Sequence, residues 1–373
     1  MSCPYQNICG GCQLRNLSTK DYQAHKQEAF KKTVEKINQK DIKIGDSIFI
    51  PDGRRRRATF AFQAKKASLV LGFNQEKSKD IIDIANCALL TKKINQNLSF
   101  IKELIKELSL VPITKKLKGK NTSTEYLNKD DISITETDNG LDVVLETKHE
   151  LNLEHRMIIS EMLGSNNDII RFSTRKDTLS QAETIIEKTK PLINIKGISV
   201  FIPAATFLQA SKEAETALID LVLKYTKDIS GNIADLFCGV GTFSYPLSQN
   251  PSNKILSIDS SKELLDGFKY SLNKNMITNI EVKLKNLFKY PLDEKELKGI
   301  DIIVIDPPRA GAENQVKHIK EAKKIIAVSC NPNTFIKDAN TIISNGYKIE
   351  EITLVDQFIY SNHSELVAVF TRA

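Results

Sequence analysis

Two apolar runs in the C-terminal half end in residues that can do chemistry. Asp306 opens the sequence Asp-Pro-Pro-Arg after one run, and Cys330 lies in the sequence Ser-Cys-Asn-Pro after the next. Proline fixes φ and ends a strand abruptly, so a carboxylate and a thiol are each presented on stiff backbone. A thiolate is a nucleophile, and a carboxylate can move a proton or stabilise charge. The alternative, in which Asp306 caps a helix and Cys330 is a packing residue, requires the same coincidence at both positions.

The elements that position these residues are predicted from the alternation of helix and strand after about residue 207. Strict alternation is typical of a parallel sheet covered on both faces, so we expect a doubly wound, Rossmann-like α/β domain. Ligands of such sheets bind outside the carboxyl ends of the strands, which places Asp306 and Cys330 at one crevice. Seven strands are expected, at 233–237, 255–259, 280–284, 302–306, 325–329, 347–355 and 366–371.

A glycine turn follows the first of these strands. Gly239 and Gly241 follow Asp235 closely, and Asp259, 24 residues after Asp235, ends the second strand, where nucleotide-binding folds keep a carboxylate for ribose hydroxyls. Taken alone, the turn could bind NAD or simply pack tightly. The third glycine of a dinucleotide fingerprint is missing, and the strand ends at Asp306 and Cys330 are reactive. Together these features favour S-adenosylmethionine.

The chain has 373 residues and a net charge of +7, and its basic character is concentrated near the N-terminus. Residues 1–100 hold 18 Lys and Arg against 9 Asp and Glu. Such an excess attracts phosphate backbones, and the run 54–57, which is four arginines, is expected to hold phosphates. A merely solvated basic face is the other interpretation.

Cysteines cluster at the N-terminus: Cys3, Cys9 and Cys12 lie within ten positions, and Cys87 follows at a distance. Six cysteines in this length are too few for a disulfide scaffold. There is no signal-peptide pattern and no long apolar stretch, so a cytoplasmic protein without membrane association is expected. Four cysteines can hold zinc or an iron–sulfur cluster, and their spacing does not decide between these.

Nearly the whole chain resembles the RNA uracil-5-methyltransferase family, which is S-adenosylmethionine-dependent and contains iron–sulfur members. The resemblance implies that Cys330 is the nucleophile and Glu365, in His-Ser-Glu, the base. It also implies a 4Fe-4S cluster on Cys3, Cys9, Cys12 and Cys87, with zinc as the alternative. The residues that it implies for the cofactor site are Gln209, Phe237, Asp259, Asn286 and Asp306.

Two departures from the family pattern stand out. Many relatives have Pro-His-Thr where this chain has Ile359, Tyr360 and Ser361, and the chain resembles a shorter subgroup without the N-terminal β-barrel RNA-binding module. We expect three regions: 1–90 with the cluster and basic RNA-binding strands, 91–200 as a central α+β region, and 201–373 as the methyltransferase domain. A monomer acting on structured RNA is expected, ribosomal RNA ahead of transfer RNA.

The expected reaction follows from the chemistry of uracil, whose C5 is a poor nucleophile. Addition of the Cys330 thiolate to C6 makes C5 nucleophilic towards a sulfonium methyl group, and Glu365 then removes the C5 proton. The target base must leave its stack to be reached. Two other functions stay open: methylation of an exocyclic amine, since Asp-Pro-Pro also occurs in amino-methyltransferases, and a non-catalytic RNA-binding assembly factor.

Overall fold

The computed structural model describes residues 3–65, 68–116 and 122–373, and the chain forms two compact units. Unit 1 consists of Met1–Gln13, Asp52–Ile193 and Ile202–Leu208. Unit 2 consists of Leu14–Pro51, Asn194–Phe201 and Gln209–Ala373. These boundaries differ from the three expected regions, because residues 14–51 pack with the C-terminal half.

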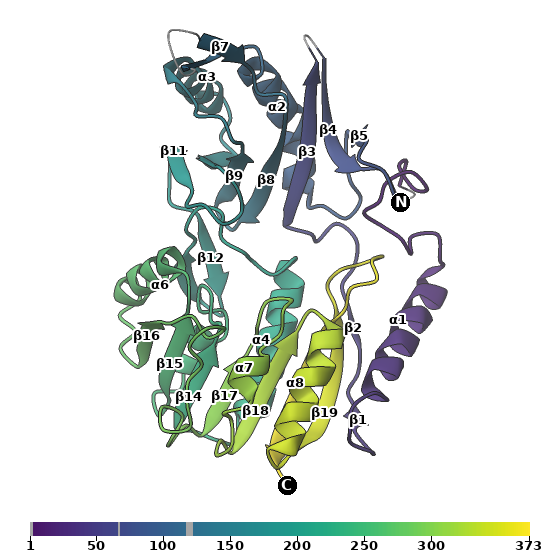
Figure 1. Cartoon of the computed structure of the whole chain (residues 1–373), viewed down its shortest axis with the longest axis vertical. Helices are drawn as coiled ribbons and strands as arrows, with labels where there is room; N and C mark the ends of the chain where they lie inside the picture. The colour runs from purple at the N-terminus through teal and green to yellow at the C-terminus, as the bar shows by residue number, and fades with distance from the viewer. Residues whose placement is uncertain (1–2, 66–67, 117–121) are drawn as a thin grey trace. The chain divides into compact units, whose positions relative to one another are not determined.

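The main sheet of unit 2 contains all seven expected strands, in the order β16-β15-β14-β17-β18-β20-β19 (Figure 1). The strands β14 to β18 are parallel to one another, whereas β20 is antiparallel to both of its neighbours. Their bounds are β14 Asn232–Leu236, β15 Lys254–Asp259, β16 Ile280–Leu284, β17 Ile302–Ile305, β18 Lys324–Ser329, β19 Tyr347–Asp356 and β20 Glu365–Arg372.

Two further strands bring this sheet to nine among the described residues, rather than the predicted seven. They are β1 (Lys43–Ile44) and β2 (Ile48–Phe49), which both pair in parallel with β19. Strands of two residues have too little alternation to be seen in a sequence, so periodicity could not reveal them.

Helices cover both faces of this sheet. Residues Ile303 and Ile305 of β17 share one apolar core with Ala339 and Ile342 of α8 and with Phe30 of α1, because alternate strand residues point to the same face. Helix α4 packs against β18, β19 and β20 without joining that core. The helices are α1 Thr19–Val34, α4 Lys212–Thr226, α5 Ser244–Ser248, α6 Lys262–Lys274, α7 Glu313–Val316 and α8 Pro332–Ser344.

Unit 1 has a mixed sheet of its own, in the order β11-β10-β9-β8-β3-β4-β5 (Figure 1). The expected boundary at residue 90 falls inside this sheet, because β3 pairs with β8 from Arg57 opposite Thr135 to Gln63 opposite Lys129. Helices α2 (Lys92–Leu108) and α3 (Leu153–Gly164) supply apolar residues to its core. The strands are β3 Arg57–Lys65, β4 Ser68–Asn74, β5 Ile81–Asp83, β8 Lys129–Thr137, β9 Gly140–Glu146, β10 Ile169–Arg175 and β11 Glu183–Glu187.

Four short strands complete the described secondary structure. They form two antiparallel pairs: β6 (Ile113–Lys116) with β7 (Thr122–Glu125), and β12 (Leu192–Ile195) with β13 (Ile198–Phe201). Across the described ranges, every helix is too short or too polar to traverse a lipid bilayer.

Candidate active site

The candidate residues of unit 2 meet at one edge of its sheet, as the topology requires. Phe237, Asp259 and Asp306 stand at the carboxyl ends of the parallel strands β14, β15 and β17, and Asn286 follows β16 closely. Cys330 follows β18 directly. Glu365 begins β20, and an antiparallel strand begins at the edge where its parallel neighbour ends.

The register between β18 and β20 brings the thiol and the carboxyl together. Ser329 and Leu366 form the last pair between these strands, and Cys330 and Glu365 are the residues next to that pair on either strand. The charge of Glu365 acts on the Cys330 thiol. The two predicted catalytic groups are therefore cross-strand neighbours.

Cys330 is held between its strand and the helix that follows. The side-chain oxygen of Asn331 caps α8 by accepting a hydrogen bond from the backbone amide of Asn333. The side-chain nitrogen of Asn331 donates to the backbone carbonyl of Arg309 at 2.9 Å. Burial raises the pKa of the half-buried Cys330 thiol to about 11; the charges of Glu365 and Asp306 add to the rise, and Arg309 opposes it. The free protein thus keeps this thiol protonated at neutral pH.

The two carboxyls beside the thiol are also shifted. Burial raises the pKa of Asp306 to about 7. Burial also raises the pKa of Glu365 well above its ordinary value, with a further rise from Asp306, while a hydrogen bond from Gln357 lowers it. Acid pKa values raised by desolvation in a shared site are typical of groups that move protons.

The glycine turn after β14 leaves space next to bare backbone. Phe237, Gly239 and Gly241 have φ values of 62°, 55° and 92°, and a Cβ on Gly239 would meet nothing within 4 Å. The Asp259 carboxylate accepts the amide of Gly239 at 3.0 Å and that of Ser261 at 2.9 Å. This carboxylate therefore fixes the turn in addition to any contact with a ligand.

The remaining cofactor candidates lie beside this turn. The ring of Phe237 packs on Phe288 with centroids 5.2 Å apart, and Asn286 accepts the backbone amide of Phe288 at 3.0 Å. Gln209, just before α4, donates to Asp306 at 3.4 Å. Asp235, at the end of β14, is fully buried; burial first, with help from the charge of Asp306, raises its pKa to about 7.

Comparisons with known proteins agree with this edge-of-sheet site. The family profile of tRNA (uracil-5-)-methyltransferases matches residues 19–373. The chain belongs to this family. It is therefore an S-adenosylmethionine-dependent RNA (uracil-C5)-methyltransferase, an enzyme rather than the non-catalytic assembly factor left open above.

Relatives cover almost the whole chain. An uncharacterised RNA methyltransferase of Agrobacterium fabrum is 34% identical over 98% of this chain and 82% of its own length. A 23S rRNA (uracil(1939)-C(5))-methyltransferase of Shewanella amazonensis is 27% identical over 99% of this chain and 81% of its own. The fold is shared with the Pyrococcus abyssi tRNA (uracil-54, C5)-methyltransferase crystallised with S-adenosyl-L-homocysteine, at a TM-score of 0.74 and 23% identity over 99% of this chain and 86% of that one.

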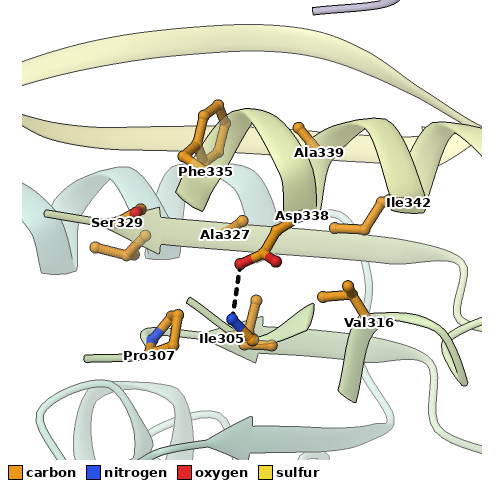
Figure 2. Close-up of a pocket in the computed structure, with 11 residues that line it drawn as sticks. Ile305, Pro307, Val316, Ala327, Ser329, Phe335, Asp338, Ala339 and Ile342 are labelled. Carbon is orange, nitrogen blue, oxygen red and sulfur yellow. Dashed lines mark hydrogen bonds between the residues drawn. The ribbon is translucent and has the colours of Figure 1, made fainter. Parts of the chain in front are cut away.

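A small cavity lies beside the strand ends of this uracil-5-methyltransferase (Figure 2). Its volume is about 10 Å³, the room of one water at most, so it holds neither a nucleoside nor a cofactor. Apart from Asp338 and Ser329 its walls are apolar side chains, among them Ile305, Phe335 and Ile342. Asp338 reaches from α8 and accepts the backbone amide of Ala312 at 2.8 Å, which ties the loop after Asp306 to the helix after Cys330.

The buried Asp338 predicts a pH-dependent stability. Burial raises its pKa to about 6, above its ordinary 3.8, so the folded state binds the proton more tightly than the unfolded state. The resulting stabilisation is complete below about pH 3.8 and is lost as the pH rises through 6. We expect Asp338→Asn, which keeps an acceptor for Ala312, to raise the free energy of unfolding by about 1–3 kcal/mol at pH 7.5 and by much less at pH 4.

Urea unfolding at both pH values measures this difference. Asp301→Asn is the matched control with the opposite sign, because an ion pair with Lys323 at 2.8 Å lowers the pKa of Asp301. An Asp338→Asn effect that is equal at pH 4 and pH 7.5 would contradict the assignment.

The segment between β19 and β20, which contains Ile359, Tyr360 and Ser361, is held by the first helix. Lys26 of α1 is 1% exposed; it pairs with Asp356 at 2.9 Å and donates to the carbonyls of Ser361, at 3.1 Å, and His363. The Tyr22 hydroxyl donates to Asp356 and accepts the Tyr360 amide at 2.9 Å. Here Tyr360 takes a φ of 57°, and α1 fixes the loop that leads into Glu365.

We expect Lys26→Met to destabilise the enzyme by about 3–5 kcal/mol, because it leaves the Asp356 carboxylate buried without its cation. Thermal unfolding measures the loss, and turnover should fall with it as the loop before Glu365 loosens. Lys32→Met, on the same helix but 66% exposed, is the control and should cost almost nothing. Recovery of stability in a Lys26→Met/Asp356→Asn double variant would show that the stranded charge is the cause.

Sequence reasoning missed this cluster, although a signal was present. Tyr22, Lys26, Phe30 and Thr33 are the buried residues of α1 and recur every three or four positions, so the lysine lies on the apolar stripe. Gln357, described below, was also missed. His363, left unassigned from the sequence, has its ring nitrogens 2.6 and 2.9 Å from Arg309.

In unit 1 the four cysteines gather in one region. The pKa of Cys87 is raised chiefly by burial and further by the charges of Cys3 and Cys9, and Arg55 feels the charges of Cys87 and Cys12. Strand-like pairing of Cys9 with Gln75 and the bond from the Ala85 amide to Tyr5 hold the N-terminal segment beside Cys87. Over the described ranges, no three His, Cys, Asp or Glu side chains stand in metal-ligand geometry.

The prediction that all four arginines of residues 54–57 hold phosphates is wrong for Arg56, which is buried, and stays a prediction for the other three. Arg54 is exposed, but Arg55 and Arg57 are half-buried and Arg56 is only 5% exposed. The cause is the strand itself, since alternate residues around the start of β3 face the core. The guanidinium of Arg57 instead lies 5.1 Å from the ring centre of Phe207.

Proposed function

We propose that this enzyme methylates C5 of a uridine in structured RNA through a covalent bond from Cys330, with Glu365 as the base. The observation that carries the proposal is that Cys330 and Glu365 adjoin the last pair of the β18–β20 ladder, Ser329 with Leu366, and that the charge of Glu365 acts on the thiol. Asp306 and Arg309 lie within electrostatic range of that thiol. A nucleophile and a proton acceptor on rigid neighbouring strands are what addition to C6 and deprotonation at C5 require.

The proposed steps balance as follows. The Cys330 sulfur forms a bond to C6, and the electron pair of the C5–C6 bond moves to the O4 side of the ring as an enolate. C5 would then form a bond to the methyl group as the bond from that methyl group to the donor sulfonium breaks, and the donor would leave as a neutral thioether. Glu365 accepts the proton from C5, the Sγ–C6 bond breaks, and the thiolate is released with its electron pair. Because the pKa of Cys330 is about 11 in the free protein, the thiol must pass its proton to solvent before the sulfur adds to C6.

The residues at the strand ends fit S-adenosylmethionine, which supplies an electrophilic methyl group on a sulfonium when bound. Asp235 has a buried carboxylate oxygen without a hydrogen-bond partner among the described residues, and the neighbouring Asp306 is half-buried with a pKa raised to about 7. Because Asp235 and Asp306 are close enough for their charges to interact, the site favours a bound cation. S-adenosylmethionine carries two cationic groups, an ammonium and a sulfonium. We assign its contacts to Gln209, Phe237, Asp259, Asn286 and Asp306.

We also propose that Cys3, Cys9, Cys12 and Cys87 hold a 4Fe-4S cluster. The observation in favour is that the charges of Cys3 and Cys9 act on Cys87 and those of Cys87 and Cys12 act on Arg55, a donor set that suits a cluster with thiolate ligands. Among the described residues these side chains do not yet stand in metal-ligand geometry, so they would have to move together to hold the cluster. Such a cluster would tie the N-terminal segment to Cys87. Iron and sulfide analysis of anaerobically purified protein should give about four of each per chain; one zinc per chain would decide for the alternative.

For the substrate we propose ribosomal RNA ahead of transfer RNA. The support is the 27% identical relative from Shewanella amazonensis, which is named for 23S rRNA and covers 99% of this chain. Mapping 5-methyluridine in both RNA pools, with and without the gene, tests the proposal. Loss of one 5-methyluridine from ribosomal RNA is expected; loss only from transfer RNA would reverse the order, and a methylated exocyclic amine would overturn the reaction.

A further inference from the structure

Gln357, immediately after β19, is a buried amide that no part of the reaction above uses. It is 4% exposed, and its Nε2 lies 2.5 Å from the Glu365 carboxylate and 2.8 Å from the Gln209 side-chain oxygen. Its Oε1 accepts the backbone amide of Ala210 at 2.9 Å. Both sides of the amide are therefore engaged by the site.

The chemistry of these contacts fixes which way the amide points. A backbone N–H can only donate, so the atom facing Ala210 must be the Gln357 oxygen, and the nitrogen must face Glu365 and Gln209. Gln209 then turns its oxygen towards Gln357 and its nitrogen towards Asp306, 3.4 Å away. The backbone amide of Ala210 thus determines the orientation of the Gln357 side chain, which in turn determines that of Gln209.

We propose that Gln357 is a positioning residue that holds the base Glu365 and, through Gln209, the methyl-donor side of the pocket in one fixed arrangement. This inference rests on the proposed role of Glu365. A carboxyl that is 2% exposed needs a donor to stay ionised, and Gln357 is placed to give one. Asp306 and Cys330, the acidic groups facing Glu365, disfavour its charge and make this donor more necessary.

The arrangement couples two events that must occur in order. Deprotonation at C5 is productive only after the methyl group has arrived, and the same amide contacts the base and the side chain next to Asp306. Gln357 touches neither the reacting carbon nor the nucleophile. Its loss should therefore impair release of the product more than formation of the covalent bond.

The test compares Gln357→Leu with Gln315→Leu in the full-length protein. Gln315 is another buried glutamine of unit 2; it bonds the amide and the carbonyl of Leu292 rather than Glu365 or Gln209, so its replacement also removes two buried hydrogen bonds. Each variant is mixed with substrate RNA and S-adenosylmethionine, quenched in denaturant, and analysed for covalent protein–RNA adduct. Turnover is measured between pH 6 and 9, with unfolding in urea alongside.

We expect Gln357→Leu to accumulate about tenfold more adduct than wild type, to lose about ten- to a hundredfold in turnover, and to shift the acidic limb of the pH profile to higher pH. Gln357→Glu keeps the acceptor for Ala210 but replaces the donor with oxygen, and should shift the limb further. Gln315→Leu should show none of these changes.

The inference is overturned if Gln357→Leu and Gln315→Leu lose equal stability and show the same amount of adduct and the same pH profile of turnover. It is also overturned if Gln357→Glu has the wild-type pH profile. Failure of the proposed function gives a different pattern. If Glu365→Gln itself turns over normally and traps no adduct, the base is misassigned and the whole scheme falls before Gln357 is tested.

Discussion

Turnover of the Cys330→Ala variant should fall by about 10⁴-fold or more, because the variant cannot make the bond that activates C5. Binding of S-adenosyl-homocysteine should be nearly unchanged, since Phe237, Asp259 and Asn286 stand at the ends of other strands. Single-turnover methylation of RNA and isothermal titration measure the two quantities. Circular dichroism and urea unfolding verify that the variant is folded.

A second measurement isolates the nucleophile from general damage to the site. RNA carrying 5-fluorouridine should trap the wild-type enzyme as a stable covalent adduct, because the fluorine at C5 cannot be removed as a proton is. The Cys330→Ala variant should form no such adduct. Cys238→Ala, at the other cysteine of unit 2, serves as the control and should still be trapped. An adduct that maps to any residue other than Cys330 would disprove the assignment.

Glu365→Gln has the second largest expected effect, a loss of about 10²- to 10⁴-fold in turnover, the contribution typical of a positioned general base. In contrast to Cys330→Ala, this variant should build up the covalent RNA adduct, because addition and methyl transfer precede the missing step. Denaturing gel electrophoresis with labelled RNA distinguishes the two variants directly. Rapid turnover without adduct would exclude Glu365 as the base.

The same substitution should change the chemistry of the thiol in the absence of RNA. The charge of Glu365 helps to raise the pKa of Cys330 to about 11, so removing it lowers that pKa. A raised thiol pKa leaves little thiolate at pH 8, and the proportion grows as the pH rises towards 11. Iodoacetamide should therefore alkylate Cys330 faster in Glu365→Gln than in wild type between pH 8 and 10; equal rates would mean that the two groups do not interact.

The elements of the fold that have a regular hydrophobic pattern in the sequence were predictable. Alternating apolar runs of four to ten residues locate all seven long strands of unit 2, and because parallel strands share an edge, Asp306 and Cys330 could be placed together before any coordinates existed. Glu365 could be named only through family resemblance. Its place near Cys330 depends on the antiparallel register of β18 and β20, which is set by long-range pairing.

What could not be predicted depends on contacts between distant parts of the chain. Lys26 forms an ion pair with Asp356, which lies more than three hundred residues later in the chain. The role of Gln357 could not be predicted because a single buried amide produces no periodic pattern in the sequence. Arg56 was misjudged for the opposite reason: its charge suggested solvent, while its position next to β3 turns it inward. In each case burial, which one sequence does not reveal, decided the role of the side chain.

The interleaved order of the segments in the two units has a consequence for dissecting the enzyme. The chain passes between the units after Gln13, Pro51, Ile193, Phe201 and Leu208, so unit 2 is assembled from three separate stretches. A fragment that starts at Asn194 would lack α1, β1 and β2, leaving one rim of β19 unpaired and the Asp356 carboxylate without Lys26. An unpaired edge strand can form backbone hydrogen bonds with other molecules, so such a fragment should aggregate and be inactive.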